Sequence, residues 1–344
     1  MRKYNVAILG ATGAVGAEFI RLLEEREFPV NTLRLLASPR SAGRRIAFRG
    51  EELVVEAVNE NSFRGIDIAL FCAGAGTSRE WAPKAVESGA VVIDNSSAFR
   101  LDEGVPLVVP EVNREAIGEH RGIIANPNCS TIIMVVALAP LHRAAGIRRI
   151  VVSTYQAVSG AGAAAIAELD EQVRAYARGE EAPAQVLPVA SLDTHYPIAF
   201  NLIPQIDRFD ELGYTKEEWK MVYETRKILG EPELRISATT VRVPVFRSHS
   251  ESINIETEKS LSPEEAREIL RAAEGVVVVD DPEAMQYPMP LYAAGKDPVY
   301  VGRIRKDPSV PSGLNLWVVG DQIRKGAALN AVQIAEEVCA RGLL

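Results

Sequence analysis

A glycine-rich turn close to the N-terminus constrains the fold of this chain more than any other feature. Residues 10–16 have the spacing G-x-x-G-x-x-G, between an apolar run at residues 4–9 and an amphipathic stretch at residues 15–26. Glycine lets the backbone approach a pyrophosphate, and the N-terminus of the following helix offers free N–H groups and a positive dipole end. This order of strand, turn and helix predicts a dinucleotide-binding Rossmann domain, with a ligand-free tight turn as the alternative.

The chain divides into an alternating part and a mixed part. Up to residue 128, short apolar runs alternate with helical stretches, which predicts a parallel sheet with right-handed crossovers. From residue 129 the pattern predicts an α+β domain, and the last helix is expected to return to the first domain. We therefore expect an α/β fold with a Rossmann domain at 1–128 plus 325–344 and a central domain at 129–324. The expected strands are 4–9, 32–37, 66–72, 90–94, 107–109, 122–125, 149–156, 236–245 and 252–258 (these two antiparallel) and 315–319; the expected helices are 15–26, 130–145, one ending near 178, 216–229, one starting at 262–265, and 325–340.

Charge and cysteine content exclude several classes of protein. The formal net charge is −8 and the pI is about 5.3, which argues against a large nucleic-acid footprint. Cys72, Cys129 and Cys339 are widely spaced and form no C-x-x-C pair, so neither a disulfide framework nor a zinc site is expected. The longest apolar run, 131–139, stops at Pro140, far short of the roughly 20 residues that span a bilayer. We expect a cytoplasmic protein with no metal, nucleic-acid or membrane partner.

The end of the second expected strand bears on the choice of cofactor. NAD-binding chains usually carry an acid there to hold the ribose 2′-OH, whereas this chain has Ser38, Arg40 and Ser41. A guanidinium beside hydroxyls suits a 2′-phosphate, so the sequence favours NADP. The alternative is that Arg40 is a solvated loop residue.

Cys129 is the strongest candidate nucleophile, because it stands between a buried strand and an apolar helix. A thiol at a helix N-terminus has a lowered pKa, and the free N–H groups there can hold an oxyanion. The alternative for Cys129 is a small core residue, which is how we interpret the other two cysteines. A nucleophile of this kind usually needs a partner. His120, His142 and His195 are weaker candidates than His249, which is expected to join two strands beside a carboxylate, Glu251, that would orient it.

These residues belong to a longer set of motifs, through which the sequence resembles the aspartate-β-semialdehyde dehydrogenase family, in its shorter bacterial branch. The resemblance covers essentially the whole chain. It implies that NADPH reduces L-aspartyl-4-phosphate to aspartate 4-semialdehyde and phosphate, in the biosynthesis of lysine, threonine, methionine and isoleucine. The matching segments are 10–16, 95–100, 126–131, 154–162, 200–204, 217–221, 241–245, 248–251 and 320–328.

The resemblance also implies roles for individual residues. Cys129 would attack the acyl phosphate and form a thioester, His249 would manage the proton on sulfur or oxygen, and Gln156 would orient the substrate. Glu217 and Lys220 are three residues apart and share a helix face, from which they could address two ends of one ligand. The implied substrate-binding residues are Arg100 and Lys220 for the phosphoryl group, Arg242 for the carboxylate, Glu217 for the ammonium group, and Asn128. The implied NADP-binding residues are Gly10, Thr12, Gly13, Ala14, Val15, Ser38, Arg40, Ser41, Thr77, Ser159, Gly160 and Gln322.

Related functions remain as alternatives. N-acetyl-γ-glutamyl-phosphate reductase shares the chemistry, but its substrate has a blocked amine and needs no ammonium partner such as Glu217. A catalytically silent paralogue should have lost Cys129, His249 or Arg242, all of which are present. An acyl-CoA reductase would need no phosphate-binding pair. The family implies a homodimer, or a pair of dimers, assembled through the central domain.

Overall fold

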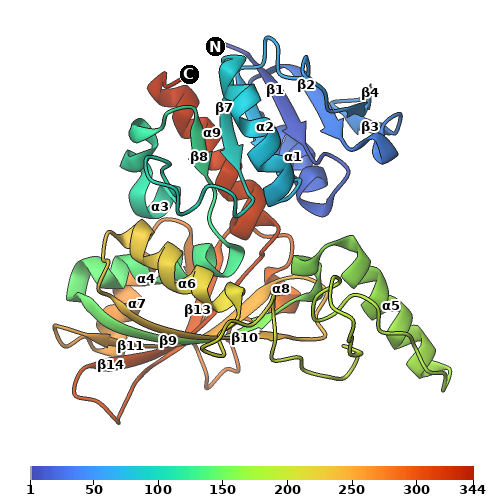
Figure 1. The fold of residues 1–344 in the computed structure, drawn as a ribbon. Helices are drawn as coiled ribbons and strands as arrows, with labels where there is room; N and C mark the ends of the chain where they lie inside the picture. Colours follow the sequence, from blue (N-terminus) through green and yellow to red (C-terminus); the bar gives the residue numbers. More distant parts are fainter. Residues whose placement is uncertain (1) are drawn as a thin grey trace. The chain divides into compact units, whose positions relative to one another are not determined.

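The structure is a computed structural model that describes residues 2–344, and these residues form two compact units. The first unit contains the chain up to Asn128 together with Gly326–Leu344, and the second is Cys129–Lys325. Each unit has its own sheet (Figure 1). The expected α/β class, a parallel sheet in the N-terminal part followed by a mixed sheet, is confirmed.

The first unit contains a six-stranded sheet in which every neighbouring pair is parallel. Its order is β5-β2-β1-β6-β7-β8. The strands are β1 Tyr4–Leu9, β2 Val30–Ala37, β5 Glu56–Ala57, β6 Ile68–Phe71, β7 Val91–Asp94 and β8 Ile123–Ala125. The strand expected at 107–109 is wrong, since only an isolated bridge joins Leu107 to Ala125. Pro106 and Pro110 flank that run, and proline cannot donate to a ladder.

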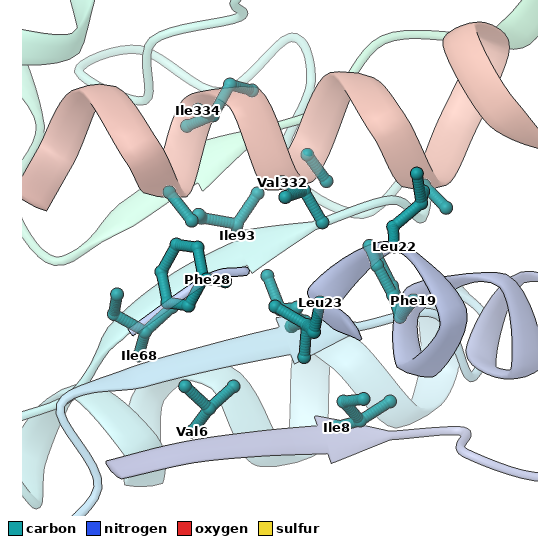
Figure 2. Close-up of a cluster of buried hydrophobic side chains, with 14 of the residues drawn as sticks. Val6, Ile8, Phe19, Leu22, Leu23, Phe28, Ile68, Ile93, Val332 and Ile334 are labelled. Atoms are coloured by element: carbon teal, nitrogen blue, oxygen red, sulfur yellow. The ribbon is translucent and has the colours of Figure 1, made fainter. Parts of the chain in front are cut away.

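Helices cover both faces of this sheet. Along β1, Val6 and Ile8 belong to the cluster that contains residues of α1 and α9, whereas Ala7 and Leu9 belong to the cluster with residues of α2. Figure 2 shows Phe19, Leu22 and Leu23 of α1 gathered with residues of the sheet and with Val332 and Ile334 of α9. The C-terminal helix therefore completes the first unit's core, as expected. The helices are α1 Ala14–Glu25, α2 Ala75–Glu87, α3 Pro110–Asn113 and α9 Leu329–Arg341, with 3₁₀ turns η1 Pro39–Ser41 and η2 Arg114–Glu119.

A hairpin in the first unit was not expected from the sequence. Strands β3 Arg45–Phe48 and β4 Glu51–Val54 pair antiparallel across a two-residue turn. Arg49 and Gly50 have φ values of +50° and +82°, which is the left-handed pair that a tight hairpin turn requires. The usual sequence signal for such a turn is Asn or Gly at the first of these positions, and this chain has arginine there.

The second unit contains a mixed six-stranded sheet with the order β10-β9-β11-β14-β13-β12. Its strands are β9 Ile147–Gln156, β10 Arg235–Arg242, β11 His249–Thr257, β12 Val276–Val278, β13 Val299–Lys306 and β14 Gly313–Gly320. The strands expected at 236–245 and 252–258 run antiparallel to each other, as predicted, but they are not neighbours in the sheet. Both pair with β9 instead, β10 in parallel and β11 antiparallel, because β9 inserts between them.

Helices α4, α6 and α7 of the second unit pack against its sheet. Helix α4 contacts the central strands β9, β11 and β14, and α6 contacts β10. Thr215 and Ser262 form capping boxes with Glu218 and Glu265, which fix where α6 and α7 begin. Within residues 2–344, no helix is long and apolar enough to cross a membrane. The helices are α4 Cys129–Ala145, α5 Ala163–Ala177, α6 Lys216–Leu229, α7 Pro263–Arg271 and α8 Pro290–Ala293, with η3 Val158–Ala161 and a π-turn η4 Arg324–Ala328 ahead of α9.

Candidate active site

Cys129 is the first residue of α4, and its side chain is partly buried. Its Sγ lies 3.5 Å from Nε2 of His249, the first residue of β11. The two residues are 120 positions apart in the chain, and they meet because α4 packs on β11. The structure therefore brings the expected nucleophile and the expected histidine into direct contact.

The main chain directly after β9 fixes the imidazole of His249. The backbone N–H of Ala157 donates to Nδ1 at 3.0 Å, so in the neutral ring the proton is on Nε2, which faces the sulfur. Burial, and then the nearby Arg242 guanidinium, lower the pKa of His249, whereas Glu217 opposes the shift, and together these effects bring the pKa to about 3. In a protonated ring Nδ1 would also carry a hydrogen, and this N–H would face the N–H of Ala157, so that two donors would repel each other. His249 is thus held as a neutral hydrogen-bond donor toward Cys129.

Glu251 does not orient His249, contrary to the expectation from the sequence. The two residues alternate onto the same face of β11, but Glu251 lies opposite Thr154 and Val318 inside the unit. Among the described residues, neither of its carboxylate oxygens has a hydrogen-bond partner, and the side chain is fully buried. Burial raises the pKa of Glu251 well above the ordinary value of 4.5.

Gln156, the last residue of β9, is held from both ends of its amide. Thr154 Oγ1 donates to its Oε1 at 3.0 Å, and its Nε2 donates to Oε1 of Glu217 at 3.2 Å. The same nitrogen lies 3.4 Å from His249 Nε2, where two donors face each other, so this is a packing contact. The amide therefore has one orientation beside the cysteine–histidine pair.

Glu217 and Lys220 lie on one face of α6, as expected from their spacing, but they bind each other. Lys220 Nζ donates to Oε2 of Glu217 at 3.0 Å and to Oδ2 of Asp207 at 3.2 Å. The carboxylate of Glu217 thus contacts both Gln156 and Lys220. Asp207 was not expected from the sequence, because nothing in its loop context distinguishes it from a solvated acid.

Arg242 ends β10 and is almost completely buried. Its Nη1 donates to the carbonyl of Ala157 at 2.7 Å, and among the described residues its Nε has no hydrogen-bond partner. Burial lowers the pKa of Arg242, while Glu217 and Cys129 raise it. A Cβ added to Gly160 would lie 3.1 Å from Arg242 Nη1 and 3.3 Å from His249 Nε2, so a larger residue in η3 would have to displace these side chains by a few tenths of an ångström.

Ser159 and Gln322 lie together near this cluster. The Gln322 amide nitrogen donates to Ser159 Oγ, and its Oε1 accepts the N–H of Ser248 at 2.8 Å. Both side chains are buried. In the second unit the structure thus brings together Cys129, Gln156, Gly160, Glu217, Lys220, Arg242 and His249, with Ser159 and Gln322 beside them.

The glycine turn in the first unit has the close contacts that a dinucleotide turn requires. Gly10 has a φ of +102°, and a Cβ on it would lie 2.9 Å from the backbone of Cys72. A Cβ on Gly16 would lie 2.3 Å from the carbonyl oxygen of Gly10. Gly13 is the N-cap of α1, and within residues 2–344 no side-chain hydrogen bond caps this helix N-terminus; Thr12 precedes the cap, and Ala14 and Val15 are the first residues of the helix. This backbone cradle fits a pyrophosphate.

The remaining expected cofactor residues lie at the carboxyl ends of the strands beside β1. Ser38, Arg40 and Ser41 follow β2, and Thr77 lies in the first turn of α2, after β6. From β1 the chain adds β2 on one side and later β6 on the other side, so the strand order reverses at β1. Ligands bind at such switch points in open α/β sheets. Arg40 is exposed there.

Arg100 and Asn128 belong to the first unit, and both are buried. Arg100 donates through Nε to the carbonyl of Asn126 at 2.9 Å and through Nη2 to that of Asn95 at 2.7 Å. The side chain of Asn330 in α9 donates to Oδ1 of Asn126 at 2.7 Å. Sequence reasoning missed Asn126 and Asn330, since a contact between residues 204 positions apart leaves no local signal.

Comparison with known proteins matches both units. Family models described as "Semialdehyde dehydrogenase, NAD binding domain" and "Semialdehyde dehydrogenase, dimerisation domain" match residues 5–120 and 138–325. The aspartate-semialdehyde dehydrogenase of Aquifex aeolicus is 60% identical over 345 residues, 99% of each chain. The crystal structure of aspartate semialdehyde dehydrogenase II from Vibrio cholerae complexed with ASA is similar with a TM-score of 0.94, at 50% identity over 99% of each chain. The Candida albicans aspartate semialdehyde dehydrogenase with NADP gives a TM-score of 0.77 at 26% identity over 100% of each chain.

Proposed function

This chain belongs to the aspartate-semialdehyde dehydrogenase family, and from that premise we propose that it reduces L-aspartyl-4-phosphate to L-aspartate 4-semialdehyde with release of phosphate. It is an oxidoreductase that uses a nicotinamide cofactor and a small-molecule substrate. Its product would serve the synthesis of lysine, threonine, methionine and isoleucine. The observation that carries the proposal is the pairing of Cys129 with His249 at the start of α4, beside Gln156 and Arg242.

The proposed reaction begins with the sulfur of Cys129 as a thiolate. It attacks the carbonyl carbon, the bond from that carbon to the phosphate oxygen breaks, and a thioester remains. A nicotinamide cofactor held beside Ser159 and Gly160 would supply hydride to this thioester. The resulting hemithioacetal oxyanion collapses to the aldehyde and releases the thiolate, so the one proton consumed overall goes to the departing phosphate. The cycle therefore needs no proton shuttle on the imidazole.

His249 supports this cycle as a hydrogen-bond donor. Its Nε2–H is 3.5 Å from the sulfur when measured between heavy atoms, and the Ala157 N–H keeps Nδ1 unprotonated. A donor in a water-poor site stabilises both the thiolate and the oxyanion that forms beside it. Helix α4 adds its N-terminal N–H groups to the same stabilisation.

Charged residues provide the proposed substrate contacts. The unpartnered Nε of Arg242 suits the substrate carboxylate, which a guanidinium can bind through two parallel hydrogen bonds. Glu217 would receive the ammonium group in place of Lys220, which would then be released to the phosphoryl group together with Arg100. Asn128 and Gln156 would align the reacting carbonyl. In this proposal the ion pair between Glu217 and Lys220 of α6 separates, and each of the two residues then binds a different group of the substrate.

Three finer features also belong to the proposal. We favour NADP over NAD, because Arg40, Ser38 and Ser41 follow β2 with no carboxylate among them. The family's dimerisation domain covers residues 138–325, so the chain forms dimers, and a pair of dimers remains the proposed larger assembly. The cytoplasm is the proposed compartment, consistent with three cysteines that are all free thiols.

The test measures NADPH formation from aspartate semialdehyde with phosphate. Turnover that requires phosphate, and that disappears in Cys129→Ser, is the expected result. N-acetylglutamate semialdehyde is the matched control, and activity with this compound alone would assign the chain to N-acetyl-γ-glutamyl-phosphate reductase chemistry. A folded protein without activity on either aldehyde would instead indicate a silent paralogue and overturn the proposal. Replacing NADP with NAD in the same assay measures the cofactor preference.

A further inference from the structure

The residue before the histidine has an unusual backbone conformation. Ser248 has a φ of +77°, in the left-handed region that residues other than glycine rarely occupy. Ser248 is the last residue of the connection between β10 and β11, and His249 follows it as the first residue of β11. A strained backbone persists only where the surrounding structure holds it in place.

Two consecutive residues after β14 hold this turn. Asp321 accepts from Arg247 Nε at 2.5 Å and from the N–H of Gly295 at 2.6 Å through the same oxygen. Gln322 accepts the N–H of Ser248 at 2.8 Å. Residues 247 and 248 are thus fastened, one after the other, to residues 321 and 322.

Gln322 also reaches the segment that fixes the imidazole. Its amide nitrogen donates to Ser159 Oγ, two residues after Ala157, whose N–H donates to His249 Nδ1. One amide therefore ties together the backbone that precedes His249 and the segment that orients its ring. Both groups of the Gln322 amide are engaged in these contacts, and the side chain is buried.

We propose that Gln322 is a positioning residue for His249, which it holds through the strained Ser248 backbone and through Ser159. This role is separate from the cofactor contact that the resemblance to the family implies for Gln322, and a measurement without cofactor tests it alone. The positioning role rests on the proposed function, since it concerns the reactivity of Cys129 beside His249. Loss of the amide would allow the 247–248 turn to relax, and Nε2 would move away from the sulfur.

The test uses Gln322→Met, which keeps the length of the side chain and removes both hydrogen bonds. The primary readout is the rate of Cys129 alkylation by iodoacetamide against pH, without cofactor or substrate. We expect the rate at pH 7 to fall roughly tenfold and the profile to move to higher pH, because the thiolate loses its donor. In turnover, kcat should fall about 10- to 100-fold, in addition to any change in the KM for the cofactor.

The rescue variant is Ser248→Gly in the Gln322→Met background. Glycine adopts a φ near +77° without strain, so the double variant should recover most of the alkylation rate. Gln172→Met is the matched control, because Gln172 is a buried glutamine that accepts from the N–H groups of Ile198 and Ala199. It should leave the alkylation profile unchanged.

Three results would overturn the positioning role. One is a Gln322→Met variant that raises only the KM for the cofactor, which would assign the amide to the nicotinamide. Another is the absence of any rescue by Ser248→Gly. If Gln322→Met alone does not fold, a folded and reactive double variant supports the role and an unfolded one refutes it. Alkylation is independent of turnover, so failure of the proposed reaction would be seen separately, as a reactive but inactive wild-type protein.

Discussion

In the first unit the candidate cofactor site is made of backbone at the ends of three neighbouring strands, whereas in the second unit the candidate reaction site is made of side chains that bind one another. The turn at 10–16 depends on the absence of side chains, since a Cβ on Gly16 would collide with the main chain. The cluster around Cys129 depends instead on partners such as Gln156 and Glu217, each held by another residue. The turn at 10–16 should therefore tolerate changes in the chemistry of nearby side chains, whereas the cluster around Cys129 should tolerate small changes in side-chain volume.

Removal of the nucleophile should have the largest effect on turnover, and it tests whether the reaction site of the second unit depends on its side chains. We expect Cys129→Ser to lower kcat by at least about a thousandfold, because serine is a poor nucleophile without an adjacent base. Thermal unfolding should be nearly unchanged, since the substitution is small. Cys339→Ala, in α9, is the control and should keep its turnover within about threefold. Equal losses in both variants would contradict the assignment of Cys129.

The burial of His249 predicts a specific dependence of stability on pH. Its folded pKa of about 3 lies below the ordinary 6.5, so the unfolded chain binds the extra proton first as the pH falls. The stabilisation is present above pH 6.5 and is lost as the pH falls toward 3. Between pH 6 and pH 4 the wild type should lose about 2–3 kcal/mol more free energy of unfolding than His249→Gln. Urea denaturation of both proteins at each pH measures this difference, and parallel curves would refute it.

Two glycines of the backbone site should respond differently to the same added methyl group. Gly16→Ala should lower the free energy of unfolding of the first unit by about 2 kcal/mol, because every close atom belongs to the main chain. Gly13→Ala meets only the Gly10 carbonyl oxygen at 3.4 Å, so it should fold normally and raise the KM for the cofactor. Denaturant unfolding and cofactor titration of both variants separate these outcomes. An equal loss of stability would mean that the turn is purely structural.

The smallest expected effect is at Asn330, whose side chain belongs to a buried hydrogen-bond network in the first unit. Asn330→Ala removes the donors to Asn126 Oδ1 and to the Val108 carbonyl, and Arg100 binds the main chain of Asn126. We expect the KM for phosphate to rise about three- to fivefold, with the KM for the aldehyde unchanged. Gln333→Ala on the same helix is the control. A uniform rise in both constants would show that Asn330 only supports the fold.

Sequence reasoning succeeded where local pattern and final environment agree. Strand β1 and the capped helix α6 match their expected ranges, because apolar run, glycine turn and capping box are all local signals. It did not predict that β9 lies between β10 and β11, because β9 lies about 80 residues earlier in the chain than β10. It also failed at 107–109, where flanking prolines outweigh β-branched residues.

For the reaction site, residue identity was predictable but supporting contacts were not. Cys129 and His249 stood out by type and context, and the structure brings them together. The group that orients the imidazole is a backbone N–H, that of Ala157, which any residue other than proline would provide. Glu251 was misinterpreted because its spacing of two from His249 gives a shared face, but not a shared environment.

The position of α9 in the chain affects the order in which the protein can fold during synthesis. Val332, Ala335 and Val338 are fully or almost fully buried in the core of the first unit, yet they are translated about 200 residues after β8. Until α9 has been translated, the part of this sheet face that α9 covers beside α1 stays exposed, while the whole second unit is already available to fold. The part of the protein that is made first is completed last, and until then its exposed apolar face is the surface most open to chaperones and to aggregation.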